Sequence, residues 1–167
     1  HKDVAAAVEA FQAEGALRPS PGDYLLWVDA NLAALKTDHA ISRHLSYDYS
    51  RKTKESAATM TYTHNGNFDW RTTRYRTFAR AYVPAGSRFI RAEMQKKDGG
   101  PWVVASQNDV SVGEEKGLQW FGLFFVLEPG NVGRVRFVYT LPEVLHSGGY
   151  TLRIQKQLGI SSFLLTV

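Results

Sequence analysis

The sequence predicts a mainly β protein: an antiparallel two-sheet β-sandwich of about eight to ten strands, preceded by one N-terminal helix. Three observations support this fold class. Apolar and polar residues alternate with a period of two over most of the chain after residue 22, as they do in half-buried strands. Gly-, Pro- and Asn-rich turns separate these segments at spacings of roughly ten residues. The 167 residues, 44% of them hydrophobic, suffice for one buried core.

Residues 1–22 are predicted to form the helix and a Pro/Gly linker that pack on the domain, and residues 23–167 form the sandwich. Asp3 can cap a helix that runs to Leu17. The apolar side chains of this segment share one helical face, which comprises Val4, Ala7, Val8 and Phe11. The linker Pro19-Ser20-Pro21-Gly22 then ends the helical pattern.

Strand predictions follow from the alternation. The clearest strand spans residues 39–50, and residues 58–63 are expected to pair with it as its neighbour, ahead of the turn Asn65-Gly66-Asn67. Further strands are expected at residues 73–83, 87–94, 102–110, 118–127, 132–140, 150–156 and 162–167. The 118–127 segment is apolar on both faces, which indicates a central, covered strand. Its aromatic residues, and Trp102 before it, are expected in the core; these are Trp120, Phe121, Phe124 and Phe125.

Composition narrows the function. The net charge of +4 and the pI near 9.4 come from dispersed Arg and Lys, which favours an acidic partner such as an anionic polymer and does not call for nucleic acid. The absence of cysteine excludes disulfides, thiolate metal sites and cysteine nucleophiles. No cofactor or metal site is predicted, because the chain has no Walker loop, dinucleotide fingerprint or metal-ligand spacing of histidines. No apolar stretch reaches the roughly 20 residues that span a bilayer, so membrane contact is expected only through a segment upstream.

Arginines interleaved with aromatic residues are the main ligand-binding candidates. Arg74, Arg76 and Arg80 share one strand face with Phe78 and Tyr82, and Arg134 and Arg136 share another face. Guanidinium groups bind carboxylate and phosphate in a bidentate manner, and aromatic rings can stack on sugars. Trp70, after a turn, is the best exposed aromatic candidate. The alternative is a solvated sheet face in which the arginines pair with Glu or Asp across strands.

Two polar triplets stand at predicted strand ends. Lys36-Thr37-Asp38 follows a strand-like apolar run, and Gln155-Lys156-Gln157 lies near the end of another. We interpret Lys36, Asp38, Gln155, Lys156 and Gln157 as a structural polar motif, with an ion pair between Lys156 and Asp38. The alternative is an enzymatic site in which Asp38, Lys36 and His64 act on a glycan or a lipid-linked phosphate.

Several short motifs, in order along the chain, resemble one known family. They are Asn31-Leu32, Lys36-Thr37-Asp38, Arg80-Ala81-Tyr82-Val83-Pro84-Ala85-Gly86-Ser87, Tyr139-Thr140-Leu141-Pro142 and the run from Tyr150 to Gly159. From about residue 23 onward the chain resembles the C-terminal part of the bacterial envelope family catalogued as domain of unknown function 4012. The resemblance implies a membrane-anchored parent protein, a location outside the cytoplasm and an association with polysaccharide. It implies no known reaction.

These observations predict a non-catalytic, extracytoplasmic domain of the cell envelope that binds an envelope polysaccharide or an envelope protein. No catalytic residue is assigned. The enzyme acting on a glycan or a lipid-linked phosphate remains the alternative.

Overall fold

The computed structural model describes residues 15–32, 35–146, 149–160 and 163–167. Most of the predicted N-terminal helix lies outside the described residues. Residues 15–17, which the prediction included, have no helical structure. Within the described part, no helix is long and apolar enough to cross a membrane.

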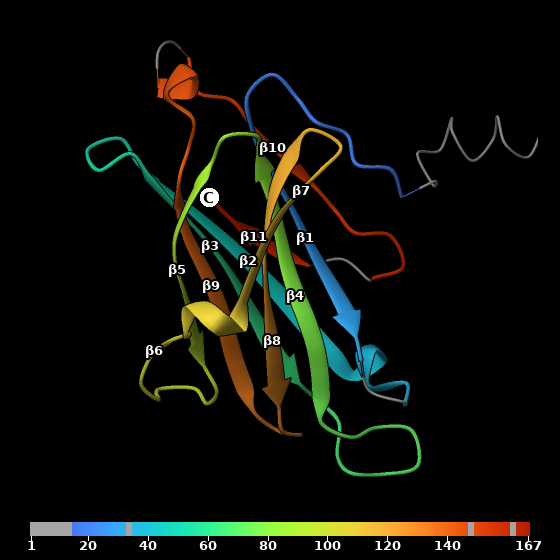
Figure 1. Ribbon diagram of the computed structural model, residues 1–167. Helices are drawn as coiled ribbons and strands as arrows, with labels where there is room; N and C mark the ends of the chain where they lie inside the picture. Colours follow the sequence, from blue (N-terminus) through green and yellow to red (C-terminus); the bar gives the residue numbers. More distant parts are fainter. Residues whose placement is uncertain (1–14, 33–34, 147–148, 161–162) are drawn as a thin grey trace, which may run out of the picture.

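The described residues form eleven strands in two facing sheets (Figure 1). Sheet A has the order β10-β1-β4-β8-β7, and sheet B has the order β11-β2-β3-β9-β5-β6. The strands of sheet A are β1 (Asp23–Asn31), β4 (Tyr75–Pro84), β7 (Val110–Glu115), β8 (Leu118–Leu127) and β10 (Leu152–Gln155). Those of sheet B are β2 (Ile41–Ser50), β3 (Glu55–His64), β5 (Arg88–Gln95), β6 (Val103–Val104), β9 (Val132–Thr140) and β11 (Leu164–Thr166). Three 3₁₀ turns complete the fold: η1 (Thr37–Ala40), η2 (Gln107–Asp109) and η3 (Glu143–His146).

The mainly β class is confirmed, but a purely antiparallel arrangement is wrong. β10 pairs in parallel with β1, and β11 pairs in parallel with β2, so both sheets are mixed. Parallel neighbours cannot be joined by a hairpin and need a long connection, which most of the chain provides here. Period-two alternation reveals which face of a strand is buried but carries no information about strand direction.

The predicted strand over residues 102–110 is also wrong. β6 covers only Val103–Val104, and the chain then forms η2 before β7 begins at Val110. The hydroxyl of Ser106 accepts a hydrogen bond from the Asn108 N–H at 3.3 Å, which favours the turn over extended backbone. By contrast, β8 and β9 match the predicted ranges, and β2 and β3 pair as predicted.

The inward faces of both sheets form one core that is rich in aromatic rings. β8 pairs with β4 on one side and β7 on the other, which confirms that it is an interior strand, but its outer face is not covered as predicted, since Phe124 is 45% exposed. Its Phe121 and Phe125 are buried as predicted. The ring centroid of Phe121 lies 5.6 Å from that of Tyr139, so side chains of the two sheets meet directly.

A buried ion pair ties the sheets together at one end. Asp29 on β1 and Arg43 on β2 both point inward, and Arg43 Nε donates to Asp29 Oδ2 at 2.8 Å. The hydroxyl of Tyr62 donates to Asp29 Oδ1 at 2.6 Å. Arg43 Nη2 donates to Asp38 at 2.5 Å and to Tyr75 Oη at 2.8 Å. Burial is the largest single effect on the pKa of Arg43 and lowers it, but Asp29, Tyr75 and Asp38 together raise this pKa by more. The net pKa lies above its ordinary value, and the guanidinium stays charged.

A second group of buried contacts, the hydrogen bonds of Asp23, joins the sheets at the opposite end of β1. The carboxyl group of Asp23 accepts hydrogen bonds from the hydroxyls of Tyr47 on β2 and Tyr150, the latter at 2.5 Å. Asp23 Oδ1 also accepts from the Tyr24 N–H at 2.7 Å. Burial raises the pKa of Asp23, because the charged form loses its hydration; the three hydrogen bonds only partly offset this.

The buried carboxyl group of Asp23 predicts a pH dependence of stability. Because the pKa of Asp23 is higher in the folded state, the folded state holds the proton more tightly than the unfolded chain. The contribution of Asp23 to stability is therefore fully present below the unfolded pKa of about 4 and falls as pH rises through the raised pKa. Denaturant unfolding between pH 4 and pH 7 should show this decline in the wild type, relative to Asp23→Asn. Parallel pH profiles for the two proteins would contradict it.

Candidate functional site

The outward face of sheet A carries a cluster of aromatic rings around one arginine. Tyr75, Thr77, Ala79 and Ala81 of β4 are buried in the core, so the alternate residues Arg76, Phe78, Arg80 and Tyr82 face outward. Tyr82 lies opposite Trp120 on β8, and Arg80 lies opposite Gly122. We call Phe78, Arg80, Tyr82 and Trp120 the aromatic platform.

Glycines of the neighbouring strands allow two rings to lie against the sheet. A Cβ atom on Gly122 would lie 2.6 Å from Cζ of Phe78, so this ring covers the glycine. A Cβ atom on Gly113 would lie 2.6 Å from Cζ2 of Trp120, so the indole covers Gly113 on β7. Since a side chain at either position would displace a ring, the two glycines shape the platform.

Arg80 lies among three of these rings. Its Cζ atom is 5.7 Å from the ring centroid of Tyr82 and 5.9 Å from those of Phe78 and Trp120, within range of cation–π attraction. Its Nε atom is buried and has no hydrogen-bond acceptor among the described residues. An unpaired buried donor is unfavourable by about 1–3 kcal/mol. Because this atom is inaccessible to solvent, a ligand oxygen would bond to it only after the Arg80 side chain turned outward, and that bond would be stabilising.

The surroundings of the platform are basic. By strand alternation, the outward residues of the five sheet A strands include Arg76, Arg80 and Arg153 but just one acidic residue, Glu115. Neither Arg76 nor Arg153 forms an ion pair with any described residue. This face therefore offers uncompensated positive charge to an anion.

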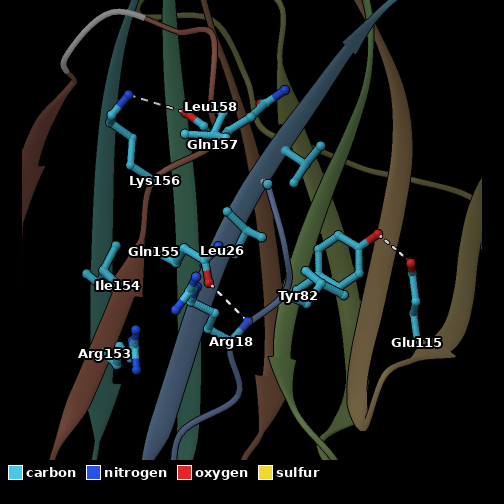
Figure 2. Close-up of a pocket in the computed structure, with 13 residues that line it drawn as sticks. Arg18, Leu26, Tyr82, Glu115, Arg153, Ile154, Gln155, Lys156, Gln157 and Leu158 are labelled. Carbon is cyan, nitrogen blue, oxygen red and sulfur yellow. Dashed lines mark hydrogen bonds between the residues drawn. The ribbon is translucent and has the colours of Figure 1, made fainter. Parts of the chain in front are cut away.

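A cavity of about 520 Å³ adjoins the platform (Figure 2). Figure 2 shows Arg153 and Gln155 of β10 on one side, Leu26 in the middle, and Tyr82 with Glu115 on the other side. The Tyr82 hydroxyl donates to Glu115 Oε2 at 2.9 Å. The same tyrosine thus contributes to both the platform and the cavity.

Two of the predicted arginines lie on the opposite sheet, and their charges are compensated. Arg136 on β9 stacks on Trp102 with Cζ 4.0 Å from the ring centroid, and its Nη1 is 3.3 Å from Glu93 Oε2. Arg134 forms an ion pair with Asp98 at 2.8 Å. For Arg134 and Arg136, the geometry therefore matches the alternative interpretation, in which the arginines form ion pairs with acidic residues on a solvated sheet face.

The remaining predicted ligand residues lie at one end of the sandwich. Arg74 precedes β4, and its Nε donates to Glu128 Oε1 at 2.5 Å. Trp70 is 84% exposed in the segment between β3 and β4, and Arg71 lies over its ring at 5.5 Å. Neither side chain belongs to the platform.

The polar triplets have structural contacts, but not the predicted one. Asp38 accepts from Arg43 instead of Lys156, so the predicted ion pair between Lys156 and Asp38 is wrong. Lys156 Nζ donates to the carbonyl of Ile160 at 2.9 Å, because β10 ends at Gln155 and the inward alternation does not reach Lys156. Lys36 is exposed, and its carbonyl accepts from the His39 N–H at 3.3 Å.

The two glutamines of the second triplet bind the first strand and the segment before it. Gln157 Oε1 accepts from the Asp29 N–H at 2.8 Å, and Gln157 Nε2 donates to the Asp29 carbonyl at 3.1 Å. β10 ends at Gln155, so it offers no backbone partner to Asp29. The carboxamide of Gln157 makes these hydrogen bonds to the backbone of β1 instead. Gln155 Oε1 accepts from the Tyr24 hydroxyl at 2.7 Å.

His64 is buried, and both ring nitrogens are bonded to backbone. Nδ1 accepts from the Gly66 N–H at 3.2 Å, so Nε2 carries the proton and donates to the Thr73 carbonyl at 2.8 Å. Thr37 Oγ1 accepts from the Thr73 N–H at 3.1 Å, which brings the first polar triplet close to His64. In this arrangement the imidazole has no nitrogen available as a general base.

The sequence interpretation missed the aromatic half of the site. Trp120, Phe124 and Trp102 were expected in the core, but Phe124 is 45% exposed and the two indoles are half-buried on outer faces. The alternation of side chains along a strand could have shown this. Trp120 and Phe121 are adjacent, so they point to opposite faces of β8 and only one of them can face the core. Gly122, two residues after Trp120, was a second signal, because glycine within a strand often marks close packing against its backbone.

Comparison with known proteins adds no assignment. The chain matches no family model and no curated protein. The outer face of sheet A, with its unpaired arginines and aromatic rings, is the feature of this chain that points to a function.

Proposed function

We propose that this chain is a non-catalytic, extracytoplasmic domain that binds an anionic envelope polysaccharide on the outer face of sheet A. The observation that carries the proposal is Arg80, held among three aromatic rings with a buried Nε–H that lacks an acceptor. The resemblance to an envelope family supports the location and a membrane-anchored parent protein.

The chemistry of the platform suits an acidic sugar polymer. The faces of sugar rings carry C–H groups that pack on aromatic rings, and their carboxylates pair with guanidinium groups. Arg80 supplies a charge whose hydrogen-bonding capacity the protein leaves partly unused, and Arg76 extends the positive charge along β4. An extended polymer that crosses the outer face of sheet A would contact both arginines, because they lie on the same face of β4.

The test is calorimetric titration with a polyuronate, for example polygalacturonate, at low and moderate salt. Trp120→Ala and Arg80→Gln should each weaken binding about tenfold or more, equivalent to roughly 1.4 kcal/mol. The affinity of the wild type should also fall as salt is raised, because exposed charges are screened.

The opposite face provides a matched control. Arg136→Gln and Trp102→Ala remove the same residue types from sheet B and should leave the affinity unchanged. If the sheet B variants lose binding and the sheet A variants do not, the proposed surface is wrong. If no acidic polysaccharide binds, the proposal fails and an envelope protein becomes the candidate partner.

A further inference from the structure

The cavity beside the platform has the size and lining of a site for one sugar residue. Its volume of about 520 Å³ falls within the roughly 300–1,000 Å³ typical of small-ligand sites. Leu26 and Val28 of β1 line it from the sheet, together with Leu17 and Leu158. Polar side chains, among them Arg153 and Glu115, also line it, and an apolar lining with a few polar groups is typical of small-ligand sites.

The wall on the β10 side is held in place by Gln155. Its Oε1 accepts from the Tyr24 hydroxyl at 2.7 Å and from the Arg18 N–H at 3.2 Å, and its Nε2 donates to the Ala16 carbonyl at 2.8 Å. These bonds fix the segment around residues 16–18 against the sheet. Gln155 is thus a positioning residue for the cavity, because its own polar atoms are engaged by the protein.

Two groups on the rim retain capacity for a ligand. Arg153 is exposed, lines the cavity and forms no ion pair among the described residues. Its planar guanidinium suits bidentate binding of a carboxylate. Glu115 uses Oε2 to accept from Tyr82, and a carboxylate oxygen can accept further hydrogen bonds from sugar hydroxyls.

We infer that this cavity binds one uronic acid residue of the polymer that crosses the platform, with Arg153 binding its carboxylate. The inference rests on the proposed function and adds the class of sugar and its position. Tyr82 connects the two parts: its ring is 5.7 Å from Arg80 Cζ, and the same side chain lines the cavity.

The test compares a defined oligogalacturonate with its methyl-esterified form. Arg153→Gln should weaken binding of the acid about tenfold and leave binding of the ester unchanged, because the ester offers no carboxylate. Val28→Trp, which fills the cavity, should weaken binding of both. Trp120→Ala should also weaken both, through the platform.

The outcomes separate the inference from the proposed function. If Trp120→Ala reduces binding while Arg153→Gln and Val28→Trp do not, the platform stands and the cavity site is overturned. If the wild type binds neither oligosaccharide, both are overturned. Arg153 is exposed, so Arg153→Gln should have the same melting temperature as the wild type. If Val28→Trp fails to fold, the result with Arg153→Gln tests the cavity site by itself.

Discussion

Replacing Arg43 with methionine is expected to lower the free energy of unfolding by about 3–5 kcal/mol. The substitution leaves the carboxylate of Asp29 buried without its cation, and the Asp29 side chain is only 1% exposed. Tyr62 would still donate to Asp29 Oδ1, but Oδ2 would lose its partner. Chemical denaturation followed by tryptophan fluorescence measures this loss.

A double-mutant cycle isolates the pair. Asp29→Leu combined with Arg43→Met should cost less than the sum of the single changes, because neither charge is then left alone. Arg74→Gln is the control, since the pair of Arg74 with Glu128 is about half exposed and should contribute about 0–1 kcal/mol. A loss below about 1 kcal/mol for Arg43→Met would show that the buried pair does not hold the sheets together.

The second large loss of stability is expected from the substitution Gly133→Val. A Cβ atom there would lie 2.7 Å from Phe125 Cζ, 2.9 Å from Leu127 Cδ1 and 3.1 Å from the carbonyl oxygen of Gln95. Phe125 and Leu127 are buried, and a backbone oxygen cannot rotate away. Gly133→Val should therefore destabilise by about 1–3 kcal/mol or more, which for a chain of this size lowers the melting temperature by roughly 2–4 °C per kcal/mol.

The same substitution at Gly122 should behave differently. It meets the side chains of Phe78 and Arg80, which are half-buried on the outer face, and it meets no backbone atom among its three nearest contacts. We expect Gly122→Val to lower the melting temperature less than Gly133→Val and to weaken polysaccharide binding by disrupting the platform. Equal thermal losses in the two variants would contradict the assignment of Gly133 to the core face and Gly122 to the outer face.

The parts of the fold that could be predicted are those governed by local alternation. β8 and β9 follow directly from the hydrophobic pattern and the turns at their ends. The parallel pairing of β10 and β11 could not be predicted, because strand direction depends on the route of the whole chain. Residues 106–109 were misassigned because a serine-capped turn interrupts a sequence that otherwise alternates.

The site was predicted in part for a related reason. The alternation of side chains along β4 is enough to place Arg76, Arg80 and Tyr82 together on its outer face. Whether an arginine is paired depends on residues distant in the sequence: Arg136 forms an ion pair with Glu93, whereas Arg80 lies among aromatic rings and forms no ion pair with a described residue. Arg43 was overlooked as an inward residue, although it alternates with Ile41 and Leu45, because its partner Asp29 lies on the other sheet.

The four tryptophans provide the most direct test of the central claim, which is that ligand binds to the outer face of sheet A. Trp27 lies in the core, Trp70 between β3 and β4, Trp102 against the outer face of sheet B and Trp120 on the platform. Their four indole N–H signals in a ¹H–¹⁵N correlation spectrum report on these places separately. On titration with oligogalacturonate, the Trp120 signal should shift while those of Trp27, Trp70 and Trp102 stay in place. A shift of Trp102 or Trp70 with Trp120 unmoved would contradict the account.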